Sequence, residues 1–242
     1  MQEIIKQQLG QMKLYGMQQA YTAVLANKRP DSLTHDELIH LLVQAEWENR
    51  ENRKINRSMK GAKFRYQASI EEIDFDKSRN LDRTQLLRLA EGVFIQKKED
   101  LLITGASGVG KSYIASALGH QACQLGCRVL YFNTQKLFSR LKMSKGDGSY
   151  IKEINKIEKF DLLILDDFAL QPLDNHNRNT LMEIIEDRHG RRSTIIASQL
   201  PVNVWYEVIG ESTIADAILD RLVHKAHRIE LQGESMRKLK SK

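Results

Sequence analysis

The chain has 242 residues, of which 41% are hydrophobic and 28% are charged, and its formal net charge is +6. This composition is typical of a folded globular protein and excludes a disordered chain, while the positive charge favours a polyanionic partner such as nucleic acid. No run of about 18 apolar residues is available to span a membrane, and the N-terminal stretch has no apolar signal-peptide core. We therefore expect a cytoplasmic protein without a membrane partner.

The first 70 residues show helical periodicity and no strand-like apolar run. The apolar positions predict one or two short helices, interrupted near Gly10 and Gly16. Thr34 followed by Glu37 is a capping-box pattern, which predicts the start of a further helix. We therefore predict a small all-helical N-terminal domain over residues 1–70, followed by a second domain over residues 71–242.

A cluster of basic residues ends this N-terminal region, with Glu51 as the acidic residue among them. Its members are Arg50, Arg53, Lys54, Arg57, Lys60, Lys63 and Arg65. On a helix, the first five fall within an arc of roughly 120°. Such a one-sided stripe suits the phosphate backbone of DNA, although a solvated helix with a Glu46–Arg50 ion pair is the alternative. Because the sequence shows no base-reading motif, we expect largely sequence-independent binding of duplex DNA.

Apolar strand patterns alternate with helical patterns in the second half of the chain. The strands are expected over 101–104, 128–132, 161–168, 193–198 and 227–231, and the helices over 111–125, 134–143, 149–157, 174–189 and 213–224. Apolar strands that are each followed by a helix indicate a mostly parallel α/β sheet that is covered on both faces.

The stretch GASGVGKS follows the first of these strands and opens a helix, as a phosphate-binding loop requires. Glycines let successive backbone N–H groups point at one anion, and the helix adds its positive N-terminal end. Lys111 supplies a mobile charge for the β- and γ-phosphates, and the Ser112 hydroxyl is a ligand for Mg²⁺. The predicted nucleotide contacts are Gly105, Ala106, Ser107, Gly108, Val109, Gly110, Lys111, Ser112 and Tyr113.

Acidic and polar residues end two later strands. Asp166 and Asp167 stand near the C-terminal end of LLILDDF. Asp166 is predicted to hold Mg²⁺ through water and Asp167 to orient the attacking water. STIIAS ends in Ser198 and is followed by Gln199, and we expect this strand tip to lie between the other two motifs. Gln199, or in its place Ser198, is predicted to contact the γ-phosphate. The N-K-x-D stretch of GTP-binding proteins is absent, so ATP is the predicted nucleotide.

Five stretches follow one another along the chain: ITGASGVGKSYIASALG, LLILDDF, IIASQLP, ILDRLVHKA and RIELQGESMR. In this order they resemble the IstB-like transposition helper ATPases, a group of AAA+ proteins close to the DnaC-type helicase loaders. The basic N-terminal block QAEWENRENRKINRSMKGAKF also resembles the sequences of this family. The resemblance covers most of the chain. It implies the AAA+ form of the P-loop fold and a bacterial, nucleoid-associated protein.

The resemblance also implies roles by position. Arg221 matches the arginine finger, which acts on ATP bound by a neighbouring subunit, so it implies a homo-oligomer with ATP at the subunit interfaces. Asp167 stands where a catalytic glutamate is common, so hydrolysis is expected to be slow and stimulated by DNA or a partner. Few residues follow Arg221, so we expect no full C-terminal lid domain, and Arg237 is the candidate to replace the sensor 2 of that lid.

The resemblance therefore implies an Mg²⁺-dependent ATPase that assembles on duplex target DNA and recruits or stimulates the transposase of the same element. A DnaC-type helicase loader and a nucleotide-gated DNA-binding module with negligible hydrolysis are the alternatives. Stable binding to duplex DNA without a helicase favours the first function, and co-purification of a helicase favours the second. A lack of phosphate release favours the third.

Overall fold

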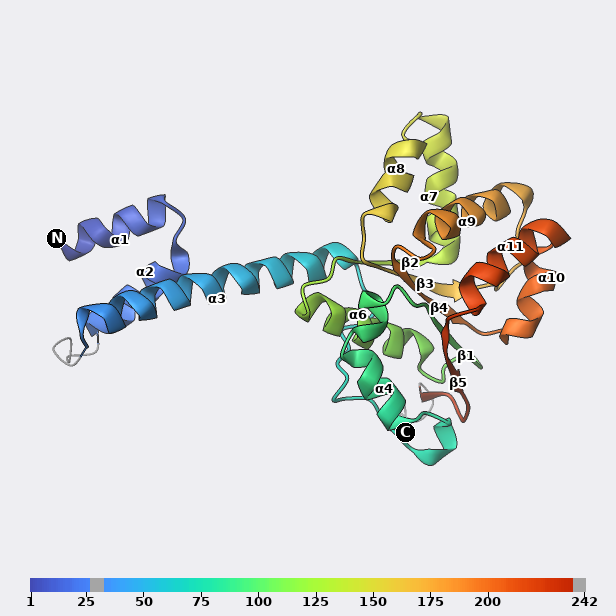
Figure 1. Cartoon of the computed structure of the whole chain (residues 1–242), viewed down its shortest axis with the longest axis horizontal. Helices are drawn as coiled ribbons and strands as arrows, with labels where there is room; N and C mark the ends of the chain where they lie inside the picture. Colours follow the sequence, from blue (N-terminus) through green and yellow to red (C-terminus); the bar gives the residue numbers. More distant parts are fainter. Residues whose placement is uncertain (27–32, 237–242) are drawn as a thin grey trace. The chain divides into compact units, whose positions relative to one another are not determined.

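A computed structural model describes residues 1–26 and 33–236 of the chain (Figure 1). The chain divides into two compact units, Met1–Arg57 and Ser58–Lys242. Across the described residues, no helix has both the length and the apolar character that crossing a bilayer requires.

The first unit is helical. It contains α1 (Gln2–Gln11), α2 (Tyr15–Ala26) and the larger part of α3 (His35–Ala62). The break between α1 and α2 falls at Lys13, which has a positive φ of 60°, and Gly16 lies inside α2. The predicted capping box is confirmed, because Glu37 accepts the backbone N–H of Thr34 at 2.7 Å and donates its own N–H to the Thr34 hydroxyl at 3.3 Å.

A buried carboxylate joins α2 to α3. Glu46 accepts the backbone N–H groups of Gly16 at 2.9 Å and Met17 at 3.4 Å, and it also pairs with Arg50 Nε at 2.7 Å. Gly16 is needed here because a Cβ atom at this position would lie 2.3 Å from the Ala45 carbonyl oxygen. Burial alone would raise the pKa of Glu46, but the hydrogen bonds from Arg50, Met17 and Gly16 lower this pKa overall.

The second unit is built on a five-stranded sheet with the order β2-β3-β4-β1-β5, in which every pair of neighbours is parallel. The strands are β1 (Leu101–Gly105), β2 (Val129–Asn133), β3 (Leu162–Phe168), β4 (Ser193–Ser198) and β5 (His227–Leu231). All five coincide closely with the strands predicted from the sequence, so the predicted parallel α/β fold is confirmed.

Helices cover both faces of this sheet (Figure 1). Leu101 and Ile103 of β1 pack with α4 (Arg83–Ala90), α5 (Val93–Gln96) and α6 (Lys111–Gln124). Leu102 points to the opposite face. There it joins α7 (Thr134–Gly146), α8 (Tyr150–Glu158), α9 (Asn175–Arg188), α10 (Trp205–Ile209) and α11 (Ser212–Val223). The sequence analysis did not predict α4, α5, α10 or the two 3₁₀ turns, Lys77–Arg79 and Val202–Val204.

The end of α3 and the segment that follows it belong to the second unit. Ala62, Ala68, Ile70 and Ile73 are buried in the hydrophobic cluster that contains α6. Most of these residues precede the domain boundary predicted at residue 70, and they form one continuous core with the sheet.

The carboxyl edge of the sheet brings the three predicted motifs together. Thr104 of β1 and Phe168 of β3 are both register partners of Ser198, which ends the strand β4 between them. The P-loop, the acidic end of β3 and the tip of β4 therefore share one edge, in the predicted order.

Candidate active site

The P-loop connects β1 to α6 and depends on glycine at particular positions. Gly105 and Gly108 have φ angles of 142° and 87°, in the region that favours glycine. A Cβ atom would lie 2.3 Å from the Leu231 carbonyl oxygen at Gly105, and 2.2 Å from the Ser235 hydroxyl at Gly108. A side chain would therefore collide with the end of β5 at Gly105 and with a residue that follows β5 at Gly108.

Lys111 lies at the first turn of α6 with its side chain directed back into the loop. Its Nζ donates to the carbonyl oxygens of Gly105 and Ala106, at 2.8 Å each, and the residue is only 7% exposed. The side chain of Val109 is buried in the core, so this residue has only its backbone to offer a ligand. The loop and the helix N-terminus together form a concave, positively polarised cradle of the kind that binds phosphate.

Asp166 at the end of β3 is held directly beside the P-loop. Ser112 Oγ donates to Asp166 Oδ1 at 2.8 Å, and the hydroxyl of Tyr131 donates to Asp166 Oδ2. The carboxylate is 1% exposed, and the Thr134 hydroxyl donates to its backbone carbonyl at 2.9 Å. Burial and the adjacent Asp166 raise the pKa of Tyr131 above its usual range, so this phenol stays a hydrogen-bond donor.

Asp167 lies in a distorted part of β3. The register shifts between Leu165 and Phe168, and Asp167 has a φ of 54°, which turns its side chain away from the regular strand direction. Asp167 Oδ2 accepts Asn133 Nδ2 at 2.9 Å and Arg65 Nη1 at 3.0 Å. Asp167 is the more accessible of the two acids, with 21% of its side chain exposed.

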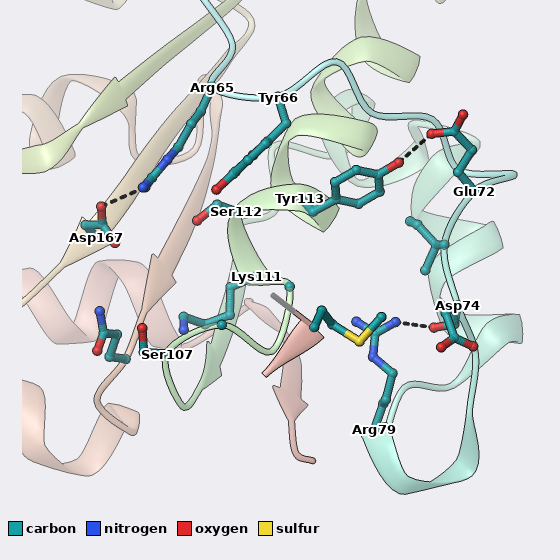
Figure 2. A pocket seen from close by; sticks show the side chains of 15 residues that line it. Arg65, Tyr66, Glu72, Asp74, Arg79, Ser107, Lys111, Ser112, Tyr113 and Asp167 are labelled. Carbon is teal, nitrogen blue, oxygen red and sulfur yellow. Dashed lines mark hydrogen bonds and ion pairs between the residues drawn. The ribbon is translucent and has the colours of Figure 1, made fainter. Parts of the chain in front are cut away.

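A cavity of about 340 Å³ opens between the P-loop, the acidic residues and a wall from residues 65–79 (Figure 2). Its lining consists of Arg65, Tyr66, Glu72, Ile73, Asp74, Arg79, Ser107, Gly108, Gly110, Lys111, Ser112, Tyr113, Asp167, Gln199 and Met236. The Tyr113 hydroxyl donates to Glu72 at 2.6 Å, and the backbone N–H of Met236 donates to the Gly108 carbonyl at 3.0 Å. These bonds attach both flanking segments to the P-loop and α6.

Arg79 brings a further positive charge to the P-loop. It is almost fully buried, and its Nη2 donates to the Val109 carbonyl at 2.9 Å while its Nη1 donates to the Asp74 carbonyl. Within the described part of the chain, its Nε has no hydrogen-bond partner. The guanidinium therefore supports the loop from behind and adds to the positive potential of the cavity.

The two candidates at the tip of β4 differ in their surroundings. Ser198 is buried, and its hydroxyl donates to the Phe168 carbonyl at 2.9 Å and accepts the Leu200 N–H at 3.1 Å. Gln199 lines the cavity, which Ser198 does not. Gln199 is therefore the better placed of the two for contact with a ligand.

Arg221 on α11 lies outside the cavity of its own chain. Its Nη2 pairs with Glu186 Oε2 on α9 at 2.6 Å, and its Nη1 donates to the Ala217 carbonyl at 2.8 Å. Arg237, the other arginine predicted to act on the nucleotide, lies outside the described residues.

Most of the predicted DNA-binding residues are exposed on α3 or just after it. Arg50, Arg53, Lys54, Arg57 and Lys60 are exposed along the helix, and Lys63 is exposed after it. The Glu46–Arg50 pair of the alternative interpretation is present, and Lys54 lies 3.8 Å from Glu51. Arg65 differs from the others, because it points into the cavity toward Asp167 (Figure 2).

The sequence analysis missed the partners of the acidic residues and the wall formed by residues 66–79. Tyr131 and Asn133 stand two residues apart on β2, and each donates to a carboxylate of β3. Asn133, the polar residue that directly follows the predicted strand 128–132, was the available signal, since a neighbouring strand ends at the same sheet edge. The wall residues show no comparable pattern in the sequence.

A phosphate-binding loop beside buried carboxylates at the carboxyl edge of this parallel sheet defines a P-loop NTPase. Residues 7–242 match the family model of the IstB-like ATP binding proteins, so the chain belongs to this family and binds ATP. The Ser112 hydroxyl and the Asp166 carboxylate, 2.8 Å apart, are oxygen ligands of the kind that Mg²⁺ prefers, so these residues fit a magnesium ion.

Curated relatives agree with this assignment. The chain is 47% identical to the insertion sequence ATP-binding protein y4pL of Sinorhizobium fredii, over 95% of this chain and 94% of that protein. It is 32% identical to the ATP-binding protein Rv3427c in an insertion sequence of Mycobacterium tuberculosis, over 96% and 93% of the two chains. These relatives confirm the resemblance seen in the sequence.

Solved structures share the fold at low sequence identity. The DnaC helicase loader matches with a TM-score of 0.58 at 21% identity, covering 69% of this chain and 98% of that chain. AMPPCP-bound DnaA from Aquifex aeolicus matches with a TM-score of 0.60 at 17% identity, covering 74% and 57%. At these identities the likeness concerns the fold alone.

Proposed function

We propose that this protein is an Mg²⁺-dependent ATPase that assembles on duplex DNA and recruits or stimulates the transposase of its insertion sequence. The observation that supports the ATPase part most strongly is the contact between Ser112 and Asp166. It joins the P-loop to the acidic strand end at 2.8 Å, beside Lys111 in one cavity. This is the arrangement that a metal-bound triphosphate requires.

Different residues of the cavity are assigned to the phosphates, the metal ion and the attacking water. Backbone N–H groups of the P-loop and the Lys111 ammonium bind the phosphates, and Ser112 with Asp166 holds Mg²⁺. The bound Mg²⁺ supplies positive charge that neutralises the phosphate oxygens. Asp167 and Gln199 orient the attacking water. Tyr66, Ile73 and Met236 offer apolar surface on the opposite wall, which suits a nucleobase.

Subunit contact completes the site in this proposal. Arg221 is absent from the lining of its own cavity, and 25% of its side chain is exposed. An arginine in this position is free to serve a neighbouring copy once its pair with Glu186 opens. A homo-oligomer with ATP at its interfaces then follows, because each site needs a residue from the next subunit.

The exposed basic residues of α3, with Lys63, form the proposed DNA surface. They contribute positive charge without any motif that reads bases, so affinity falls steeply with salt and depends little on sequence. The curated relatives are insertion sequence ATP-binding proteins, which supports a role in transposition over one in helicase loading. Such a protein acts on the bacterial nucleoid in the cytoplasm. A nucleotide-gated DNA-binding module with negligible hydrolysis is the remaining alternative.

The test is Lys111→Ala with ATP binding, phosphate release and duplex DNA binding measured side by side. Loss of a charge-assisted contact to phosphate is expected to weaken ATP binding by roughly 10- to 100-fold. ATP-dependent assembly on DNA should then disappear. Assembly on DNA that survives in Lys111→Ala would refute the coupling. Wild-type protein that assembles with ATP but releases no phosphate would establish the gated module instead.

A further inference from the structure

Arg65 is a charged residue of the cavity that the functions proposed so far leave without a role. Its Nη1 lies 3.0 Å from Asp167 Oδ2 and 3.3 Å from Asp166 Oδ2, so one guanidinium contacts both acidic residues. Figure 2 shows the side chain reaching across the cavity toward Asp167. Both acidic residues therefore have a charged partner in the structure.

The backbone next to Arg65 is anchored by packing within the ATPase unit. Phe64 stacks edge-on against His120 with ring centroids 4.3 Å apart. This close approach depends on Gly119, because a Cβ atom there would lie 2.4 Å from the Phe64 ring. Ala62 and Ala68 on either side are buried in the core. The position of Arg65 is thus part of the fold, and only its long side chain is free to move.

Arg65 supplies charge where the other donors supply only hydrogen bonds. Ser112, Tyr131 and Asn133, which also donate to these two carboxylates, are neutral. An arginine guanidinium stays protonated in proteins. Arg65 therefore adds a permanent positive charge beside Ser112 and Asp166, the two residues that fit a magnesium ion.

A cation at Asp166 and the Arg65 guanidinium exclude each other. Ser112 contacts Oδ1 of Asp166 and Arg65 contacts Oδ2 of the same carboxylate, so a cation held by Ser112 and Asp166 lies a few ångströms from the guanidinium. Like charges at that separation in a partly buried site repel strongly. Arg65 has 41% of its side chain exposed, whereas Asp166 has 1%, so the arginine is the partner able to leave. Movement of Arg65 also frees Asp167, to which it donates at 3.0 Å.

We propose that Arg65 is an internal counter-ion that competes with Mg²⁺ for Asp166 and Asp167, which makes it a positioning residue of the ATPase site. This inference rests on the proposed ATPase function. Arg65 holds both carboxylates in the absence of nucleotide and leaves them when Mg²⁺ and ATP are bound. Asp167 then becomes available to the attacking water. Arg65 thereby raises the Mg²⁺ concentration at which the site responds, and it suppresses metal binding without nucleotide.

The direct test measures binding of Mn²⁺, a stand-in for Mg²⁺, to the full chain without nucleotide by electron paramagnetic resonance. Arg65→Gln removes the charge and keeps a hydrogen-bond donor. It is expected to bind Mn²⁺ roughly 10-fold more tightly than wild type. Arg228→Gln is the matched control, because Arg228 is an exposed arginine on β5 outside the cavity, and it should leave the affinity unchanged. Equal Mn²⁺ affinity in wild type and Arg65→Gln would overturn the proposal.

A second readout is the Mg²⁺ dependence of ATP hydrolysis. Arg65→Gln should reach half of its maximal rate at a lower Mg²⁺ concentration than wild type. A fall in turnover with unchanged Mn²⁺ affinity would instead assign Arg65 to the phosphate, and the counter-ion role would be rejected. If circular dichroism shows that Arg65→Gln is unfolded, Arg65→Lys replaces it. The lysine side chain is shorter and its ammonium is more strongly hydrated than a guanidinium, so it holds the two carboxylates less firmly. A few-fold tighter Mn²⁺ binding is therefore expected, and unchanged binding rejects the proposal.

These measurements distinguish a failure of the Arg65 counter-ion proposal from a failure of the proposed ATPase function. The Mn²⁺ titration uses no ATP, so it tests Arg65 whether or not the protein hydrolyses nucleotide. A wild-type chain that neither binds nor hydrolyses ATP would refute the proposed function. A wild-type chain that does both, with Arg65→Gln indistinguishable from it in Mn²⁺ affinity, would refute only the counter-ion.

Discussion

Asp100 gives the ATPase unit a pH dependence that can be worked out from the structure. It directly precedes β1, and its Oδ1 accepts the backbone N–H of Thr194 at 2.6 Å while its carbonyl accepts the N–H of His227 at 2.9 Å. Burial raises the pKa of Asp100 to about 7, although the Thr194 hydrogen bond and the charge of Arg188 act in the opposite direction. Asp100→Asn keeps the acceptor oxygen and removes the titration.

The raised pKa of Asp100 determines whether the stability of the fold rises or falls with pH. The folded chain holds the Asp100 proton more tightly than the unfolded chain, whose carboxyl has the ordinary pKa of 3.8. The contribution of Asp100 to stability is therefore complete below pH 3.8 and is lost as the pH rises through about 7. At 1.36 kcal/mol per pKa unit, the difference between 3.8 and about 7 corresponds to about 4 kcal/mol as an upper estimate.

Urea unfolding of wild type and Asp100→Asn at acidic and mildly alkaline pH measures this contribution. The other titrating groups are common to both chains, so the difference between the two free energies of unfolding isolates Asp100. That difference should move in favour of the variant by up to about 4 kcal/mol between ~pH 4 and ~pH 8. A difference that stays constant over this range would show that Asp100 is already ionised in the folded chain, and the burial argument would be wrong.

Two further variants test other parts of the molecule. Arg221→Ala should retain ATP binding and lose hydrolysis by roughly 10³-fold, and mixing it with Lys111→Ala should restore part of the turnover, since each supplies what the other lacks. Normal phosphate release by Arg221→Ala, or no rescue in the mixture, would show that the finger is misassigned. Glu46→Gln should destabilise the first unit by about 2 kcal/mol at neutral pH, because a buried acceptor of Gly16 and Arg50 loses its charge. The pKa of Glu46 is lowered, so this penalty should shrink as acid protonates the wild-type carboxylate, and a penalty independent of pH in calorimetry would contradict the assignment.

The sheet was predictable because its signals are local. Each strand is a short apolar run followed by a helical pattern, and the P-loop pattern identified the junction of β1 and α6. The helices α4 and α5 were missed because they are short and lack a long periodic pattern. The stability of these two helices comes mostly from tertiary packing, which a local sequence pattern does not report.

The site was predictable only in part, because several of its contacts join residues far apart in the sequence. Lys111, Ser112 and the two aspartates stand in recognisable local patterns, and strand order then places them together. Arg65 belongs to a run of basic residues, so its charge pattern indicated nucleic acid. Lys63 takes a positive φ of 59° just after α3, and the chain leaves the helical path there. Nothing in the local sequence reports that turn or the pocket that receives Phe64.

The walls of the cavity come from segments near the two ends of the ATPase unit's sequence, residues 65–79 and Met236, and the P-loop lies between these segments in the sequence. A nucleotide in this space contacts all three segments simultaneously. Its binding free energy therefore also stabilises the folded state of the two end segments. At a free nucleotide concentration of about 100 times Kd, the added stability is roughly 2.7 kcal/mol. The two segments already meet, because the Gln232 N–H donates to the Arg79 carbonyl at 3.0 Å. Amide hydrogen exchange should therefore slow together at both ends when nucleotide binds.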